Sequence, residues 1–376
     1  MTLNRRSALQ KRLFLFITVL AKVTYMTVFT KGTFDLIHAG HMRYLTKAKS
    51  LGNKLIVGVV SDESRKKLKG KKPLLPQNLR REVVEGFKQV DTAVIVEEDN
   101  LLKTLKKIKP DILFTIETNI ESGVVDKKIE KFVESYGGKI VIEPQTKPYF
   151  TVKKMIDRMA KLKIKQYIER SLGTLTLRIK EEDKESLTNK PGFEYLISFP
   201  TVDTATSSLA KTLQLSKLQE LKSKAEKEKK KIVFTGGSWD ILHIGHIRYL
   251  QQASKKGDIL VVGVASNGNI RKHKGDGRPV IDEESRAGLL NFVKGVYATV
   301  IYDDVLVVLQ LLKPDVLWTP EEEWNDPTQS AEGKFVASYA GQVIKAKKGS
   351  DEVSASKIIY NLAGQKVKEI FKKLLE

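Results

Sequence analysis

Two pairs of histidines in this sequence have the spacing and the surroundings that a phosphate site needs. His38 and His41 are three residues apart, and His243 and His246 have the same spacing. Each pair follows a glycine-containing turn after an apolar run and leads into a helical pattern. At the start of a helix, side chains three apart lie on one face, beside backbone N–H groups without a partner in the helix. We therefore expect each pair to bind an anion, with phosphate as the obvious candidate.

The histidines belong to a twelve-residue stretch that the chain contains twice. It covers residues 30–41 and again residues 235–246, at an offset of 243 − 38 = 205 residues. Four of the five histidines of the chain lie in these two copies, so chance is a poor explanation for their placement. The sequence thus predicts two similar sites in one chain.

The elements around the two copies repeat as well. Apolar segments at residues 27–29, 55–61, 94–96, 109–113 and 139–142 have counterparts at 232–234, 260–266, 299–302, 313–317 and 342–344. Continuous apolar runs of this kind are typical of parallel strands buried on both faces, and amphipathic helical patterns lie between them. We predict an α/β protein with two tandem, doubly wound, Rossmann-like parallel sheets, each with its site at the carboxyl ends of the strands.

The same offset predicts the domain boundaries. Subtracted from the chain length it gives 376 − 205 = 171, so we place the first domain at residues 26–171 and the second at 231–376. Residues 172–230 have no counterpart and are predicted to form a connector, with a charged helix over 209–231.

Residues 1–25 combine basic residues with a short apolar run, and no clear cleavage site follows. We expect a dispensable extension there; the alternative is a targeting or membrane-contacting segment.

Composition narrows the partners and the compartment. The chain has 66 Lys and Arg residues and 45 Asp and Glu residues, which gives a net charge of +21. This charge favours anionic partners such as nucleotides, phosphorylated metabolites, nucleic acid or an acidic membrane surface. The lysine run at 227–231 lacks interleaved aromatic residues, so we expect no nucleic acid. We expect no membrane contact either, although an apolar face among lysines at 358–375 leaves that alternative open. The chain has no cysteine, which excludes disulfides and thiolate chemistry and fits a reducing cytoplasm.

Both turns resemble the signature Gly-x-Phe-Asp-x-x-His-x-Gly-His of the cytidylyltransferase-like nucleotidyltransferases. The resemblance implies two nucleotidyltransferase-like domains that move CMP or AMP from CTP or ATP, with Mg²⁺, to a phosphorylated alcohol or sugar and release pyrophosphate. In architecture the chain resembles the ethanolamine-phosphate cytidylyltransferases, which also carry two such domains. Its second half, at residues 274–279, resembles the heptose-1-phosphate adenylyltransferases. The two domains are expected to pack as a pseudo-dimer within one chain, and further homo-oligomers remain open.

The resemblance also assigns roles to individual residues. The catalytic set that it implies is His38, His41, His243, His246, Lys69 and Lys274. The nucleotide-binding set that it implies is Gly32, Thr33, Phe34, Asp35, Gly237, Ser238, Trp239, Asp240, Arg80, Arg286, Thr151, Ser354 and Ser356. Other roles stay open: turn or capping positions for the aspartates, surface charge for the lysines, and pairing with a carboxylate for the arginines. No residue is assigned to a metal.

Two departures from the family pattern concern the nucleotide site. Members of the family carry a segment Arg-Thr-x-Gly-Ile/Val-Ser-Thr-Thr, which corresponds to residues 145–152 and 350–357 of this chain, and neither copy keeps its arginine. Neither copy keeps the Gly-Asp pair that follows the fourth strand in many members. The alternative function is therefore a nucleotide-binding regulatory or scaffold protein with weak or lost turnover. Because the second copy keeps hydroxyl groups at Ser354 and Ser356, we expect it to be the more competent site.

Overall fold

A computed structural model describes residues 26–121, 123–144, 212–275, 278–321 and 330–347, and the single residues 354, 357, 358, 360 and 361. The predicted extension at residues 1–25 lies outside the described residues, and so do residues 145–211, which include Thr151 and most of the predicted connector. The same holds for Ser356 and for residues 362–376, which form most of the predicted apolar face. None of the helices in the described part of the chain is long and apolar enough to cross a membrane.

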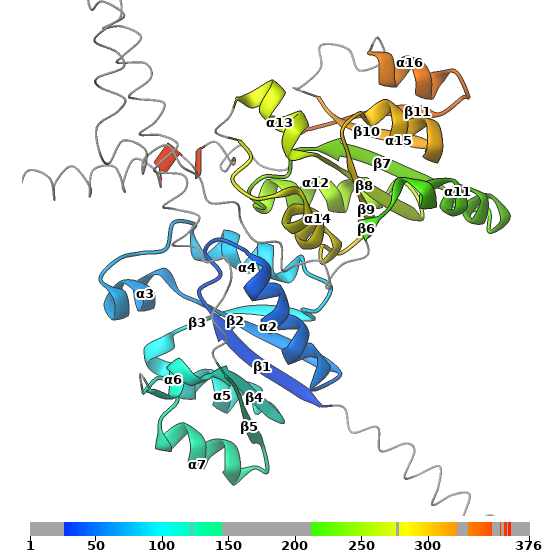
Figure 1. Ribbon diagram of the computed structural model, residues 1–376. Helices are drawn as coiled ribbons and strands as arrows, with labels where there is room; N and C mark the ends of the chain where they lie inside the picture. Colours follow the sequence, from blue (N-terminus) through cyan, green and yellow to red (C-terminus); the bar gives the residue numbers. More distant parts are fainter. Residues whose placement is uncertain are drawn as a thin grey trace, which may run out of the picture. The chain divides into compact units, whose positions relative to one another are not determined.

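Five parallel strands of the first repeat form one sheet in the order β3-β2-β1-β4-β5 (Figure 1). The strands are β1 (Thr27–Gly32), β2 (Lys54–Val60), β3 (Thr92–Val96), β4 (Ile112–Ile116) and β5 (Lys139–Glu143). The helices are α2 (Ala39–Ser50), α3 (Asp62–Lys69), α4 (Gln77–Glu85), the 3₁₀ turn η1 (Glu98–Asn100), α5 (Leu101–Ile108), α6 (Glu117–Glu121) and α7 (Lys127–Ser135). The strand order reverses at β1, so its carboxyl end lies at the switch point where sheets of this kind bind ligands.

The second repeat forms a sheet of six parallel strands in the order β11-β10-β7-β8-β9-β6. The strands are β6 (Thr212–Leu213), β7 (Ile232–Gly237), β8 (Ile259–Ala265), β9 (Val296–Tyr302), β10 (Val316–Pro320) and β11 (Gln342–Ala346). The helices are the 3₁₀ turn η2 (Leu215–Lys217), α11 (Leu218–Lys227), α12 (Ile244–Ser254), α13 (Asn267–Lys274), α14 (Glu283–Asn291), α15 (Val305–Leu312) and α16 (Ala331–Ala337). Strand β7 takes the place of β1 at the switch point.

Alternate residues of the central strand face opposite helix layers, as the pleat of a strand requires. Phe29 packs in a buried cluster with side chains of α5 and α7, whereas the hydroxyl of Thr30 hydrogen-bonds the hydroxyl of Tyr44 on α2. On β7, Phe234 packs in the same way in a buried cluster with side chains of α15 and α16, and the hydroxyl of Thr235 hydrogen-bonds the hydroxyl of Tyr249 on α12. Helices therefore cover both faces of each sheet, and the predicted α/β class with two doubly wound parallel sheets is confirmed.

The described end of the predicted connector joins the second sheet. Strand β6 pairs in parallel with β9, and Leu218, Leu221 and Ala225 of α11 are buried in the same core as α15. The charged helix predicted over residues 209–231 is therefore shorter, because β6 and η2 precede it. The other domain boundaries that follow from the offset stay a prediction.

By packing, the chain divides into two compact units whose limits differ from those of the repeats. The second unit includes Phe34–Arg43 and Pro73–Lys88, which belong to the first repeat by sequence. Within this unit, Arg248 of α12 donates two hydrogen bonds, at 2.6 and 2.7 Å, to the carboxylate of Glu82 on α4. Helices α4 and α12 therefore pack within one compact unit.

Candidate active site

The turn of the motif holds an aromatic residue in the left-handed region in both repeats. Phe34 and Trp239 each have φ of 51°, a conformation that is strained for a bulky residue and recurs at functional sites. Both rings are buried, and Nε1 of Trp239 donates to the carbonyl of Gly263 at 2.8 Å. A Cβ at Gly237 would lie 3.0 Å from the Trp239 ring, so glycine leaves the room that the turn needs. The turn thereby brings the first histidine of each pair to the start of a helix.

Each histidine pair stacks where its helix begins. The ring centroids are 3.9 Å apart for His38 and His41, and also 3.9 Å apart for His243 and His246. In both repeats, Nδ1 of the first histidine accepts a hydrogen bond of 3.1 Å from the backbone N–H two residues further on. Because Nδ1 accepts, a neutral ring carries its proton on Nε2. The first histidine of each pair therefore keeps an N–H donor for an anion at the helix start.

Burial keeps these histidines neutral at ordinary pH. Desolvation lowers the pKa of His38 and of His243 to about 4, and the charge of Arg43 adds to the effect at His38. Desolvation also lowers the pKa of His41 and of His246 well below the usual value, and the first ring of each pair adds to it. A bound triphosphate would raise all four pKa values, because its negative charge favours the protonated rings. The pairs can thus donate hydrogen bonds when neutral and take up positive charge as a phosphate arrives.

The two aspartates of the motif hold a neighbouring loop. Asp35 accepts hydrogen bonds from the backbone N–H groups of Leu74 and Leu75, at 2.8 and 2.9 Å. Asp240 accepts two equivalent bonds from the residues before α14, at 2.7 and 2.9 Å, and also pairs with Arg278 at 2.5 Å. This geometry favours the turn role over direct contact with a ligand, since the chain itself uses both oxygens of each carboxylate. A nucleotide contact for either aspartate stays a prediction.

The two arginines predicted to reach phosphate are buried, with Arg80 0% and Arg286 1% exposed. Each donates its Nε to a backbone carbonyl before its own helix, Leu75 at 2.8 Å and Ile281 at 2.9 Å. Arg286 donates further to the carbonyl of Ser238 at 2.5 Å, and to a side chain of α13. These contacts give Arg286 a positioning role beneath the turn. The predicted phosphate contact of both arginines stays a prediction.

The two predicted lysines have different surroundings. Lys274 ends α13, and its Nζ lies 3.3 Å from the hydroxyl oxygen of Ser238 in the motif turn. Lys69 is exposed at the end of α3. Among the other predicted hydroxyl groups, Thr33 is half-buried after β1, and Ser354 accepts the N–H of Lys357 at 3.2 Å, as a capping residue does. The structure thus brings Lys274 to the turn of the second copy.

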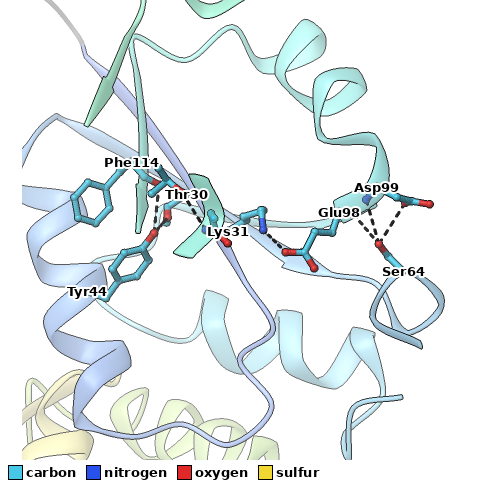
Figure 2. A network of polar contacts seen from close by, with 9 residues as sticks. Thr30, Lys31, Tyr44, Ser64, Glu98, Asp99 and Phe114 are labelled. Atoms are coloured by element: carbon cyan, nitrogen blue, oxygen red, sulfur yellow. Dashed lines mark hydrogen bonds and ion pairs between the residues drawn. The ribbon is translucent and has the colours of Figure 1, made fainter. Parts of the chain in front are cut away.

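Sequence reasoning missed a tyrosine that braces the central strand. The hydroxyl of Tyr44 lies 2.5 Å from that of Thr30 and donates to the carbonyl of Phe114 at 3.3 Å (Figure 2). Tyr249 makes the same contacts, at 3.1 Å to Thr235 and at 3.2 Å to a carbonyl of β10. Each tyrosine ties its helix to the two strands of the switch point. The signal was available, because Arg-Tyr-Leu follows the motif in both copies.

A doubly wound parallel sheet with a glycine-containing turn and a helix start at its switch point is characteristic of an α/β nucleotide-binding protein. The family model described as Cytidylyltransferase-like matches residues 29–179 and 234–361, about three quarters of the chain. The chain belongs to this cytidylyltransferase-like family and contains its domain twice.

Curated relatives match over a shorter stretch. The Bifunctional protein HldE of Pelobacter propionicus is 43% identical over 114 residues, which are 30% of this chain and 23% of that protein. The protein of the same name from Helicobacter pylori (strain J99) is 47% identical over 109 residues, 28% of this chain and 23% of that protein. The chain thus spans about a quarter of the length of these relatives. A solved structure, the lipopolysaccharide core biosynthesis protein from Thermoplasma volcanium GSS1, is 28% identical with a TM-score of 0.27 and covers 33% of this chain and 98% of that one.

Proposed function

We propose that the chain is a nucleotidyltransferase that moves CMP or AMP from CTP or ATP to a phosphorylated small molecule and releases pyrophosphate. The observation that carries this proposal is the stacked histidine pair of each repeat, held neutral by burial and fixed by a backbone N–H on Nδ1. Membership of the cytidylyltransferase-like family supports the reaction class. The resemblance of residues 274–279 to adenylyltransferases supports ATP, and the two-domain architecture supports CTP, so both nucleotides enter the test.

In the proposed reaction, a phosphate oxygen of the acceptor attacks the α-phosphorus of the triphosphate. A new P–O bond forms while the bond from the α-phosphorus to the bridging oxygen of the β-phosphate breaks, and pyrophosphate leaves with that electron pair. Such a transfer depends on alignment and on neutralisation of the developing charge more than on covalent catalysis. The histidine N–H groups and the helix start would supply donors at the phosphates, and Lys274 would add a fixed positive charge beside the second turn.

Mg²⁺ is proposed to enter with the triphosphate as part of the substrate. Within the described residues, no group of three or more His, Cys, Asp or Glu side chains is placed to hold a metal ion. The donors of the site are histidine, lysine and backbone N–H groups, which suit phosphate oxygens, whereas Mg²⁺ prefers oxygen ligands such as phosphates. When bound to the triphosphate, Mg²⁺ supplies charge neutralisation between its phosphate groups.

Release of pyrophosphate tests the proposal. The intact chain is incubated with Mg²⁺, with CTP or ATP, and with single phosphorylated acceptors that include glycerol phosphate, hexose phosphates and phosphoethanolamine. We expect release with one nucleotide and one class of acceptor, and none from the double variant His41→Ala/His246→Ala. If every combination gives no pyrophosphate while CTP or ATP still raises the melting temperature, the chain binds nucleotides without turnover, and the regulatory or scaffold alternative replaces the proposal.

A further inference from the structure

One ion pair joins a helix of the first repeat to the histidine-bearing helix of the second. Arg248 of α12 donates from Nε and from Nη2 to the two carboxylate oxygens of Glu82 on α4, at 2.6 and 2.7 Å. Such a bidentate contact fixes the direction of both side chains as well as their distance. The hydrogen bond from Arg248 lowers the pKa of Glu82, so the carboxylate is charged at neutral pH. The pair therefore helps to set how α12 lies against α4.

Helix α4 is a fixed support for this contact, because both of its ends are held within the same compact unit. Before its start, two backbone N–H groups donate to the carboxylate of Asp35 in the first motif. After its end, the N–H of Lys88 donates to the carbonyl of Phe292 at 2.8 Å, and its ammonium group donates to the carbonyl of Asn291 at 2.6 Å. None of these bonds involves Glu82, so we expect α4 to stay in place when Glu82 is replaced.

The contact lies close to the histidines of the second site. His243 is the N-cap of α12, His246 lies in the first turn, and Arg248 follows two residues later. The neighbouring Ile247 packs so close to the end of α4 that a Cβ added at Gly86 would lie 2.5 Å from its Cγ2. A phosphate at a helix start is bound by N–H groups that point along the helix axis. The direction of α12, which α4 fixes, therefore sets where these donors point.

The first repeat lacks the equivalent carboxylate. The counterpart of Arg248 is Arg43, but when α4 and α14 are aligned by their buried arginines, the counterpart of Glu82 is Gly288. Glycine has no side chain that could pair with an arginine. Within the described residues, the buried Nε of Arg43 has no hydrogen-bond partner, and its charge contributes to the lowered pKa of His38. The arginine that follows the histidines is thus held by a carboxylate of the other repeat in the second copy alone.

We propose that Glu82 is a positioning residue of the second site, supplied by the first repeat. By holding Arg248, it keeps α12 in the direction in which the helix start and the Nε2 of His243 meet the triphosphate. The second repeat offers no equivalent residue to the first site. This inference rests on the proposed nucleotidyl transfer, and it adds that the second site is complete only with helix α4 of the first repeat.

The test measures each site separately. Pyrophosphate release reports the second site in a His41→Ala background and the first site in a His246→Ala background. CTP and ATP are each combined with glycerol phosphate, a hexose phosphate and phosphoethanolamine. In the His41→Ala background, Glu82→Ala should lower kcat about tenfold and leave KM for the triphosphate nearly unchanged, because misaligned donors mainly lose contacts made in the transition state. In the His246→Ala background, Glu82→Ala should change neither value.

Glu85→Ala is the matched control. Glu85 lies on the same helix and is 38% exposed where Glu82 is 36% exposed, but it pairs with Arg81 of α4 itself. Alanine favours the helix at both positions, so α4 is retained in both variants. The control should leave kcat unchanged at both sites. Because Glu82 acts through Arg248, adding Arg248→Ala to Glu82→Ala should cause no further loss.

Hydrogen exchange gives a readout that is independent of turnover. In Glu82→Ala, the backbone amides in the first turns of α12 should exchange about fivefold faster than in the intact chain, since the helix loses one of its supports. Glu85→Ala should leave their exchange unchanged. Mass spectrometry of peptides that cover residues 241–250 measures both variants.

The outcomes distinguish the two proposals. No pyrophosphate from the intact chain under any condition overturns the proposed function, and the role of Glu82 in the reaction falls with it. Turnover with an unchanged kcat in Glu82→Ala, or a second site without turnover beside an active first site, overturns the inference alone. An equal loss at both sites, or an equal loss in Glu85→Ala, would show a general effect on α4 and also overturns it. Unchanged exchange in α12, or a further loss on adding Arg248→Ala, contradicts action through Arg248.

Discussion

The two motif copies share the geometry of their histidines and differ in what surrounds them. Both pairs stack at 3.9 Å, and both first histidines accept a 3.1 Å hydrogen bond on Nδ1. Around the second turn, Lys274 contacts Ser238 and Arg278 pairs with Asp240. The histidine pairs are therefore arranged alike in both copies, and the differences lie in the residues that hold each turn and in those that border it.

The difference also concerns how firmly each turn is held. The Arg278 and Asp240 side chains are 19% and 5% exposed, so their ion pair is shielded from water. In the first copy, the corresponding Lys72 pairs with Glu63 instead, and these side chains are 53% and 65% exposed. Ion pairs as exposed as this contribute little. The second turn is thus the better fixed, which supports the proposal that the second site is the more active.

Removal of one histidine at a time should give the largest effect. His246→Ala is expected to lower total pyrophosphate release by about 100-fold to 1,000-fold, the range found when a donor to a transition-state oxygen is lost. His41→Ala should leave a substantial part of the activity. Steady-state pyrophosphate release measures both. Equal losses would mean two working sites or one shared site, and the reverse order would make the first site the more active.

Acid should destabilise both copies alike. In the folded chain the pKa of His243 is about 4, below the usual value of 6.5, so the unfolded chain binds the proton first as pH falls. The free energy of unfolding therefore decreases between about pH 6.5 and pH 4, by roughly 3 kcal/mol from this group. Urea unfolding at pH 7, 5.5 and 4 should show a smaller decrease in His243→Gln, and also in His38→Gln. Parallel curves for wild type and variant would contradict the neutral assignment.

The lysines should distinguish the copies at the level of nucleotide binding. In the His41→Ala background, Lys274→Met is expected to raise KM for the triphosphate by about tenfold, because a charge-assisted contact beside the turn is lost. Lys272→Met, at an exposed position of the same helix, is the matched control. Lys69→Met in the His246→Ala background should have a smaller effect. If Lys69→Met has the larger effect, the assignment of the better-formed site is wrong.

The smallest expected effect concerns the bracing tyrosines. Tyr249→Phe removes one hydroxyl that contacts Thr235 and a carbonyl of β10, and should lower the free energy of unfolding by about 1 kcal/mol. Tyr44→Phe should act in the same direction through Thr30 and Phe114. Urea unfolding monitored by fluorescence and by circular dichroism provides the measurement. No change in either variant would show that these hydrogen bonds add nothing beyond what water offers in the unfolded chain.

Local patterns in the sequence were sufficient for the fold and for the histidines. Buried parallel strands need continuous apolar runs, so the runs at 55–61 and 260–266 predict β2 and β8 directly. Three-residue spacing at a helix start places both histidines of a pair on one face, which the stacked rings confirm. The predicted connector was less accurate at its end, because a two-residue strand such as β6 has no periodicity of its own.

Sequence alone determined the fold class, the repeat and the histidine pairs, since each depends on residues close together in the chain. Only the tertiary structure decided how the remaining polar groups are used. Asp240 accepts a hydrogen bond from the N–H of Val280, which is forty residues later in the chain, and Lys31 forms an ion pair with Glu98, which is sixty-seven residues later. Such pairings depend on which strand ends lie side by side at the edge of the sheet, and no local pattern encodes that. Burial then set the protonation of the histidines, because desolvation acts on a side chain only after the chain has folded around it.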